Sequence, residues 1–229
     1  MKPPETLKPE MILHTPYRPN RPTATVADET LAIMSQRRTI RHFSPKPVSK
    51  RVIETLVHTA TTAPSGANKQ PWRYIAVSDP DTKRRIRSAA EREEQAFYTH
   101  RATKQWLNDL APLGTDEHKA FLEIAPWIIV IFRLTKADDG GQIYYGQESV
   151  GISAGLFLTA AHLAGLATLT HTPAPMGFLR ELLGRPEHEK PFLLIPVGYP
   201  AEDCQVPVFA THRRPLQEAL IVNPKPIAR

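Results

Sequence analysis

Apolar residues repeat at helical spacing in some segments of this chain and form short runs in others. The clearest helical spacing begins after Ser49, a favourable N-cap residue, and comprises Val52, Ile53, Leu56, Val57 and Ala60. Asp79 and Pro80 form a cap and first-turn pair for another helix, which the pattern extends to about Thr99. These two segments therefore predict amphipathic helices that cover a core.

Short apolar runs between the expected helices predict the strands of a sheet. The runs cover residues 74–77, 127–132, 167–170 and 192–197, lengths that suit strands better than helices. Further helices are expected over residues 28–36 and 147–164, and no internal repeat occurs. This order of elements predicts an α+β domain, with a central sheet flanked by helices.

Length and composition indicate a soluble protein with one sizeable core. The chain has 229 residues, of which 41% are hydrophobic and 23% charged, as in ordinary globular domains. Residues 1–23 are rich in proline and polar side chains, so we expect an extended arm there. A folded domain is expected over 24–220 and a C-terminal tail over 221–229.

The chain shows no pattern of a signal peptide or a membrane span. Its longest apolar run, 124–132, contains Pro126 and fits a buried strand. The single cysteine, Cys204, excludes an intrachain disulfide and suits a reducing compartment. We therefore expect a cytoplasmic protein.

A net charge of +6 suggests an anionic ligand, and sequence motifs indicate which class of ligand this is. The basic residues are spread along the chain without a basic–aromatic motif, so nucleic acid is not expected. No metal is expected, because neither an HExxH sequence nor a cysteine–histidine cluster occurs. A glycine-rich dinucleotide fingerprint is also missing, so the charge best suits a cleft for a small anion.

Two segments carry candidate chemistry. Arg37, Arg38 and Arg41 place three guanidinium groups within five residues, a pattern suited to bidentate phosphate binding. In the loop 63–72, Gly66 permits the close approach of a flat ligand and Ser65 offers a neutral hydrogen-bonding group. Each segment alone also fits a structural role, as a solvated basic helix end or as an ordinary helix-to-strand connection.

Together, these two segments resemble the nitroreductase-like flavin-binding superfamily. Later motifs follow in an order and spacing similar to those of its iodotyrosine deiodinase branch, at 91–98, 106–110, 118–119, 169–173, 183–190, 196–200 and 213–216. The resemblance extends from about Met34 to Leu220. It implies a nitroreductase-like fold with a mixed or antiparallel sheet, in a domain-swapped homodimer with FMN sites at the subunit interface.

The resemblance also implies an activity. Members of this branch remove halide reductively from mono- and diiodotyrosine, and the same reaction is expected on bromo- and chlorotyrosine. The electrons would come from FMN, which an unidentified donor or reductase would reduce.

Individual residues acquire cofactor roles from the resemblance. FMN contacts are implied for Arg37, Arg38, Thr39, Arg41, Ser65, Gly66, Thr170, His171, Thr172 and Arg213. Thr172 is the catalytic candidate, because a hydroxyl at this position reaches flavin N5 and favours the one-electron-reduced flavin. Vertebrate members have threonine where this chain has His171, so the histidine is expected either to pack or to contact the flavin.

Four residues are implied to bind the substrate. Glu94 and Lys119 would pair with the ammonium and carboxylate groups of the amino acid, in a lid over about residues 88–122. Tyr98 would wall the site, and the backbone N–H of Ala67 would point at the phenolate oxygen. Taken singly, these residues also fit a solvated acidic helix face, partial packing or a surface lysine, and Thr172 fits a turn.

Two other functions stay open. A broad nitro- or quinone reductase of the same fold would use NAD(P)H and would need no amino-acid group on its substrate. A non-enzymatic basic binding protein would be colourless, and its affinity for nucleic acid would fall steeply with salt.

Overall fold

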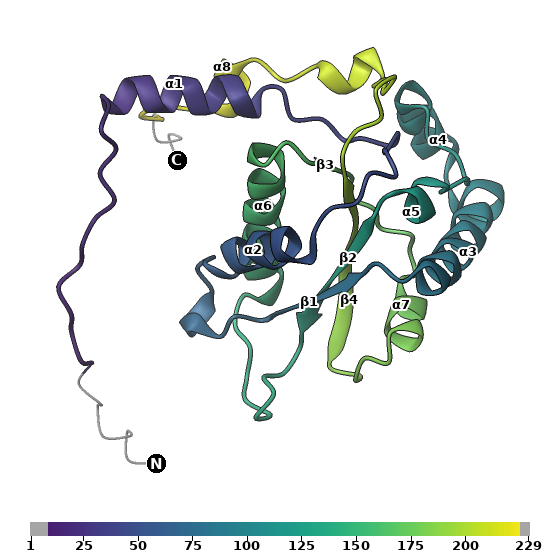
Figure 1. The fold of residues 1–229 in the computed structure, drawn as a ribbon, viewed down its shortest axis with the longest axis horizontal. Coiled ribbons are helices and arrows are strands. Elements are labelled where there is room, and N and C mark those ends of the chain that lie inside the picture. Colours follow the sequence, from purple (N-terminus) through teal and green to yellow (C-terminus); the bar gives the residue numbers. More distant parts are fainter. Residues whose placement is uncertain (1–8, 225–229) are drawn as a thin grey trace, which may run out of the picture. The chain divides into compact units, whose positions relative to one another are not determined.

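The computed structural model describes residues 9–224, in two units that divide the chain after Gln36. The expected arm at 1–23 and tail at 221–229 therefore lie partly outside the described residues. In the first unit, an extended segment precedes helix α1 (Thr23–Met34), as Figure 1 shows in purple. This helix begins earlier than the expected residue 28, because Pro22 supplies a fixed φ of −54° at the N-cap.

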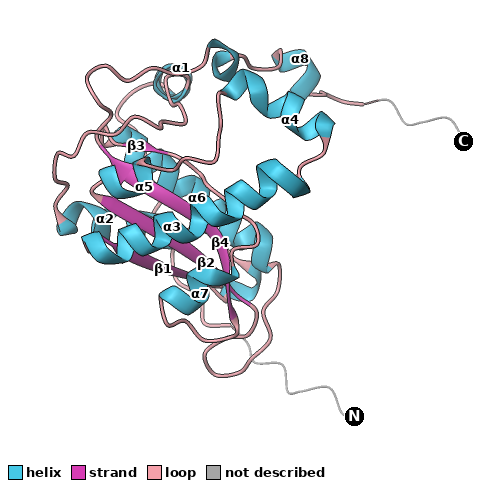
Figure 2. Cartoon of the chain, turned by 90° about the vertical axis from the view of Figure 1, so that its right-hand side faces the viewer, coloured by secondary structure: helices cyan, strands magenta, loops and turns pink. Residues whose placement is uncertain are grey.

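A four-stranded sheet forms the centre of the second unit (Figure 2). Its strands are β1 (Trp72–Val77), β2 (Trp127–Leu134), β3 (Ala167–Thr168) and β4 (Glu189–Gly198). They lie in the order β1-β2-β4-β3, and every neighbouring pair is antiparallel. All four strands occur where apolar runs predicted them, although β4 begins three residues early because Glu189 pairs with Leu134 at the end of β2.

The second unit contains seven α-helices among the described residues. They are α2 (Lys50–Thr61), α3 (Pro80–Ala96), α4 (Lys104–Leu110), α5 (Phe121–Ile124), α6 (Gly146–Leu163), α7 (Gly177–Leu182) and α8 (Leu216–Ala219), with short 3-10 turns η1 (Gly66–Asn68), η3 (Ala111–Leu113) and η4 (Val208–Thr211). Three of the helices, α2, α3 and α4, begin at a capping side chain. Ser49 accepts a hydrogen bond from the N–H of Val52, and Asp79 accepts one from the N–H of Thr82 at 2.8 Å. The α-helical part of α3 is shorter than expected, since its last turn widens into a π-helical segment, η2 (Phe97–Arg101).

Helices cover both faces of the sheet, and β2 shows how the core is divided. Ile129 and Ile131 pack in a cluster with α2 and α6. Ile128, Val130 and Phe132 pack in a second cluster with α3, α5 and α7, which Figure 1 places on the other side of the sheet. Because both faces are buried, β2 has a continuous apolar sequence instead of an alternating one. No helix within residues 9–224 is long and apolar enough to cross a bilayer.

An ion network around one buried carboxylate holds the start of β4. Glu189 is 1% exposed and accepts hydrogen bonds from Arg185 at 2.7 and 2.8 Å and from Arg73 of β1 at 3.1 Å. Arg73 also pairs with Asp138 at 2.7 Å. The hydrogen bonds from Arg185, against the opposing effect of burial, hold the pKa of Glu189 below its ordinary value. The network thus ties β1, β4 and the loop after β2 together.

The edge of the sheet beside β3 joins two segments that are far apart in sequence. The N–H of Ile40 donates to the carbonyl of Thr168 at 3.0 Å, in a parallel bridge between Thr39 and Thr168. His171 and Leu194 exchange two backbone hydrogen bonds, of 2.9 and 3.0 Å. The arginine-rich segment and residues 169–172 are therefore held at the same edge.

Candidate active site

A cavity of about 310 Å³ lies between this sheet edge and the helices that follow β1. Its volume suits a small molecule. Its lining consists of Arg41, Glu94, Phe97, Tyr98, Trp106, Leu110, Thr115, Lys119, Phe121, Leu169, Thr170, His171, Thr172 and Ala174. Predicted substrate residues and predicted flavin residues therefore meet in one place.

Two opposite charges face each other in this cavity. Oε2 of Glu94, on α3, lies 3.2 Å from Nζ of Lys119, and the two side chains are only 13% and 7% exposed. Nζ of Lys119 also donates to the carbonyl of Asp116, and the Lys119 N–H donates to Glu91 at 2.7 Å. Backbone and side chain together tie the loop before α5 to α3. The cavity thus presents one carboxylate and one ammonium group with little competition from water.

Aromatic side chains supply much of the remaining lining. The hydroxyl of Tyr98, in the π-helical segment, donates to Oγ1 of Thr115 at 2.9 Å. Burial raises the pKa of Tyr98, so this hydroxyl stays protonated. The ring of Phe97 meets the rings of Tyr98 and Trp106 edge to face, with centroids 5.2 and 4.9 Å apart. These rings offer apolar surface for a flat ligand.

His171 lies close to the charged pair. Its Nε2 is 3.9 Å from Oε1 of Glu94, and its ring meets Phe121 edge to face with centroids 5.9 Å apart. Burial lowers the pKa of His171 to about 3, and the positive charges of Lys119 and Arg41 act in the same direction. The imidazole is therefore neutral at physiological pH.

A cluster of arginines fits the phosphate of a flavin. Burial, followed by the nearby charges of Arg213 and Arg38, lowers the pKa of Arg37. Among residues 9–224, no carboxylate lies within ion-pair distance of Arg37 or Arg213, and Arg213 instead donates to the carbonyls of Ala210 and His212. The guanidinium groups of Arg37 and Arg213, which have no carboxylate partner among the described residues, are suited to an anion with several oxygens.

A second cavity of about 270 Å³ shares Arg41 with the first. Its lining consists of Thr39, Arg41, His42, Leu113, Gly114, Gln205, Val206 and Pro207. Burial lowers the pKa of Arg41, while Tyr98 and Asp116 oppose this shift. Since Arg41 lines both cavities, the two cavities adjoin at this residue, which connects the segment around Thr39 with the residues after β3.

The loop between α2 and β1 carries three predicted site residues, Ser65, Gly66 and Ala67, and none of them lines either cavity. The N–H of Gly66 donates to Oγ of Ser149 on α6 at 3.3 Å. A Cβ at position 66 would lie 2.7 Å from the carbonyl oxygen of Tyr144. The chain itself therefore requires a glycine here, in addition to the ligand approach expected from sequence.

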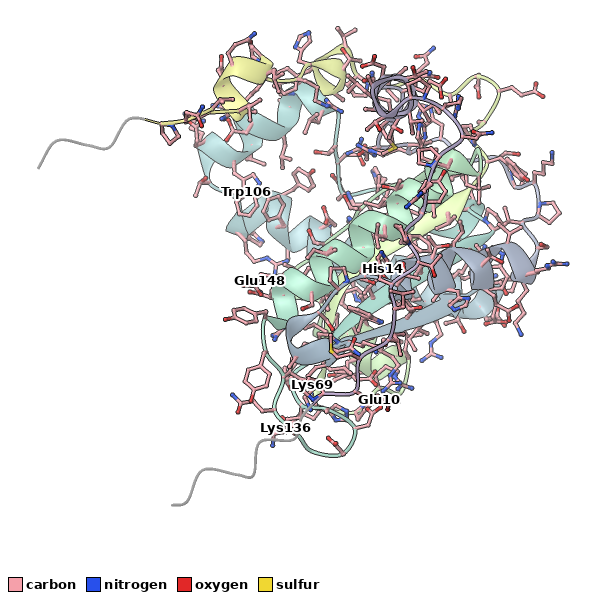
Figure 3. The ribbon with its side chains drawn as sticks, turned by 90° about the vertical axis from the view of Figure 1, so that its left-hand side faces the viewer. Glu10, His14, Lys69, Trp106, Lys136 and Glu148 are labelled. Carbon is pink, nitrogen blue, oxygen red and sulfur yellow. The ribbon has the colours of Figure 1, made fainter. Side chains whose placement is uncertain are left out.

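This loop is strained. Ala67, Asn68 and Gln70 have φ angles of 49°, 52° and 47°, in the left-handed region that non-glycine residues seldom adopt. In Figure 3, Lys69, beside these residues, lies well away from Trp106, which lines the cavity. Left-handed residues gather at functional sites, so the loop is a second candidate functional element outside the cavity.

The cavity contains the predicted residues Arg41, Glu94, Tyr98, Lys119, Thr170, His171 and Thr172. Thr39 lines the second cavity, and Arg37, Arg38 and Arg213 form the arginine cluster. Sequence reasoning gave no role to Thr115 or Phe121, which also line the cavity. Thr115 lies in a loop and Phe121 begins a four-residue helix, so no periodic pattern pointed to either.

Comparisons with known proteins identify the family of this chain. The family model "Nitroreductase family" matches residues 34–199. An iodotyrosine deiodinase of Haliscomenobacter hydrossis is 56% identical, over 78% of this chain and 82% of that protein. The human iodotyrosine deiodinase 1 is 38% identical, over 93% of this chain and 76% of that protein.

A solved structure of an iodotyrosine deiodinase also matches this chain. The crystal structure of oxidised iodotyrosine deiodinase bound to FMN and 3-iodo-L-tyrosine matches with a TM-score of 0.68 and 29% identity, covering 76% of this chain and 90% of that chain. The fold and the site thus define a flavoprotein of the nitroreductase type. The chain belongs to the nitroreductase family and, within it, to the iodotyrosine deiodinases.

Proposed function

We propose that this protein is an FMN-dependent reductive dehalogenase that converts mono- and diiodotyrosine to tyrosine and iodide. The observation that carries the proposal is the buried pair of Glu94 and Lys119, 3.2 Å apart in a cavity lined by aromatic rings. A zwitterion attached to a flat ring matches both features. Relatives named iodotyrosine deiodinase, one of them solved with 3-iodo-L-tyrosine bound, support the choice of substrate.

Some of the residues that would hold the cofactor line the two cavities, whereas Arg37, Arg38 and Arg213 line neither. Arg37, Arg38 and Arg213 would bind the FMN phosphate, while Thr39 and Arg41 would contact the ribityl chain. Thr170 and Thr172 would contact the ring system from the segment after β3. Bound FMN supplies the two electrons that, with one proton, replace a carbon–iodine bond by a carbon–hydrogen bond and release iodide.

The protein's own contribution is to bind and orient the substrate. Glu94 would bind the ammonium group and Lys119 the carboxylate, so the ligand would replace the internal pair with two new charge pairs. Tyr98 would wall the ring, and the lid over about 88–122 would exclude water, which strengthens both pairs. The same contacts would accept bromo- and chlorotyrosine, since none of them involves the halogen.

Ser65, Gly66 and Ala67 would act from a second copy of the chain. This loop packs by Gly66 against the start of α6 and lines neither cavity in its own chain. Beside it, α6 exposes Gly151, Ile152 and Gly155, a flat face suited to packing against another copy. In a homodimer, the Ala67 N–H would then donate to the substrate phenolate oxygen, and the arm at 1–23 would exchange between subunits.

Iodide release tests the proposal directly. The purified protein, reduced with dithionite without oxygen, would be mixed with diiodotyrosine, and tyrosine and iodide would be measured against the oxidised protein as control. Repeated turnover is expected. A yellow protein that leaves diiodotyrosine intact but is quickly reoxidised by nitroaromatics or quinones would instead be a nitroreductase.

The cellular setting of the reaction is part of the proposal. The single Cys204 suits a reducing compartment, so we place the enzyme in the cytoplasm, with a separate reductase or small donor that reduces the flavin.

A further inference from the structure

His171 occupies an unusual position in the cavity. Its backbone is fixed by two hydrogen bonds to Leu194, and its ring is held edge to face on Phe121. Its Nε2 is buried and has no hydrogen-bond partner among the described residues. A buried polar atom without a partner is unfavourable, because it has lost its hydrogen bonds to water without replacement. A simple packing role would not require this cost, because an apolar ring would fill the same space.

The nearest charged partner of this nitrogen is Glu94. Nε2 lies 3.9 Å from Oε1 of Glu94, while Oε2 of the same carboxylate lies 3.2 Å from Nζ of Lys119. One oxygen of Glu94 is thus engaged by the lysine, and the other faces the histidine just beyond hydrogen-bond distance.

We propose that His171 is a positioning residue for the amino-acid end of the substrate: its Nε2–H donates to Oε1 of Glu94 once the substrate carboxylate has drawn Lys119 away. This inference rests on the proposed function. With Oε1 held by the imidazole, Oε2 is left to accept from the substrate ammonium group. The neutral imidazole adds a donor without adding a positive charge that would repel the ammonium.

This arrangement makes a selective prediction. A ligand that carries the ammonium and carboxylate groups separates Lys119 from Glu94, and Glu94 then accepts a hydrogen bond from His171. A halophenol without those groups leaves the pair of Glu94 and Lys119 intact, so the hydrogen bond from His171 does not form. His171 therefore discriminates between the two ligand classes, whereas a flavin contact would affect both.

The test compares 3-iodotyrosine with 2-iodophenol. Their dissociation constants for the oxidised holoenzyme would be measured from the change in flavin fluorescence. His171→Phe keeps a ring against Phe121 but removes the donor, and we expect about a tenfold weaker affinity for 3-iodotyrosine, the loss of one hydrogen bond to a charged group. The affinity for 2-iodophenol should not change. His171→Gln, which keeps an N–H donor at a similar reach, should recover most of the loss.

Two controls make the result specific. His188 also has a buried Nε2 without a partner, but it faces Asp138 at 3.8 Å, outside the cavity. His188→Phe should leave both affinities unchanged. In combination with Glu94→Gln, the His171→Phe change should cost nothing further, since the histidine acts through the carboxylate.

Several outcomes would overturn the inference. Equal losses for both ligands, or loss of bound FMN from His171→Phe, would make His171 a ring or flavin contact. An unchanged affinity for 3-iodotyrosine would leave it no role in binding. A wild-type enzyme that releases no iodide would remove the proposed function instead, which is a separate measurement.

Discussion

Glu94 and Lys119 pair with each other at 3.2 Å in the cavity that we assign to the substrate. Each is therefore both the partner of the other and a prospective partner of the ligand. A zwitterion enters without leaving a buried charge unpaired, because it brings one new partner for each. A ligand with only one of the two charges would strand either the carboxylate or the ammonium group.

Neutralising either member of this pair should weaken substrate binding. For Glu94→Gln and Lys119→Gln, we expect KM for diiodotyrosine to rise about 100-fold, the usual cost of removing one partner of a buried charge pair. Bound FMN should be retained, which its absorbance would show. Glu54→Gln, which breaks the exposed pair with Lys50 on α2, serves as the control. Wild-type affinity in either cavity variant would contradict the assignment of the lid.

Thr172→Ala should alter how the flavin accepts electrons. Thr172 lines the cavity and is the candidate donor to flavin N5. We expect less one-electron-reduced flavin during stepwise anaerobic reduction with 3-fluorotyrosine bound, since the strong carbon–fluorine bond keeps that ligand intact. The absorption spectrum reports the amount. Thr55→Ala, on the exposed side of α2, is the control, and an undiminished signal in Thr172→Ala would remove its catalytic role.

Arg213→Ala should separate cofactor binding from stability. Arg213 lies close enough to Arg37 that its charge, after burial, lowers the pKa of Arg37. Removing Arg213 should weaken FMN binding about tenfold or more, through the lost charge-assisted hydrogen bonds to phosphate. The apoprotein should be as stable as wild type or more so, because repulsion is relieved. FMN titration would measure the affinity, and thermal unfolding of the apoprotein would measure the stability. Arg84→Ala, which removes an exposed arginine of α3, is the control and should leave FMN affinity unchanged.

His171 should make the fold sensitive to acid. Its pKa is about 3 in the folded protein against about 6.5 when unfolded, so the unfolded chain binds more protons between these values. Its contribution to stability is full above pH 6.5 and falls as pH drops, by up to about 1.4 kcal/mol per unit. The charged groups facing it are Glu94, Lys119 and Arg41. Urea unfolding between pH 7 and 5 should show a smaller loss for His171→Gln; an equal loss would assign the effect to other groups.

Glu189→Gln should destabilise the fold without touching the cavity. The substitution leaves Arg185 and Arg73 facing a neutral side chain, and breaking a buried pair costs about 3–5 kcal/mol; since both arginines are partly exposed, we expect about 2 kcal/mol. Urea unfolding would measure the loss. Iodotyrosine affinity of the folded fraction should stay at the wild-type value, and a changed affinity would mean that the network also supports the site.

The sequence predicted strands well where both faces of the strand are buried, and helices well where a capping residue precedes the helix. The run of apolar residues in β2 and the caps Ser49 and Asp79 correspond to elements of the structure. Periodicity missed the π-helical turn that carries Tyr98, because side-chain spacing does not record a change from α to π hydrogen bonding. The start of α1 was also misplaced, since Pro22 was a better marker than the acidic residue 28.

The candidate site was predictable mainly as a set of motifs. Glu94 and Lys119 were expected to meet different ends of a ligand, and their contact with each other could not be inferred from spacing. Thr115 escaped notice because a lone threonine in a loop has no pattern. The isolation of Nε2 of His171 depends on packing between segments far apart in the sequence, so no local sequence could reveal it.

The strained loop at 63–72 and the cavity are separate parts of one folded chain. If the loop of one subunit completes the cavity of the other, as proposed, a chain with an altered loop and a chain with an altered cavity would restore activity when they are combined in one dimer. A chain altered at Glu94 and a chain altered in the loop would form one site with both defects and one with neither. Two inactive preparations, unfolded and refolded together, would then regain activity that neither has alone.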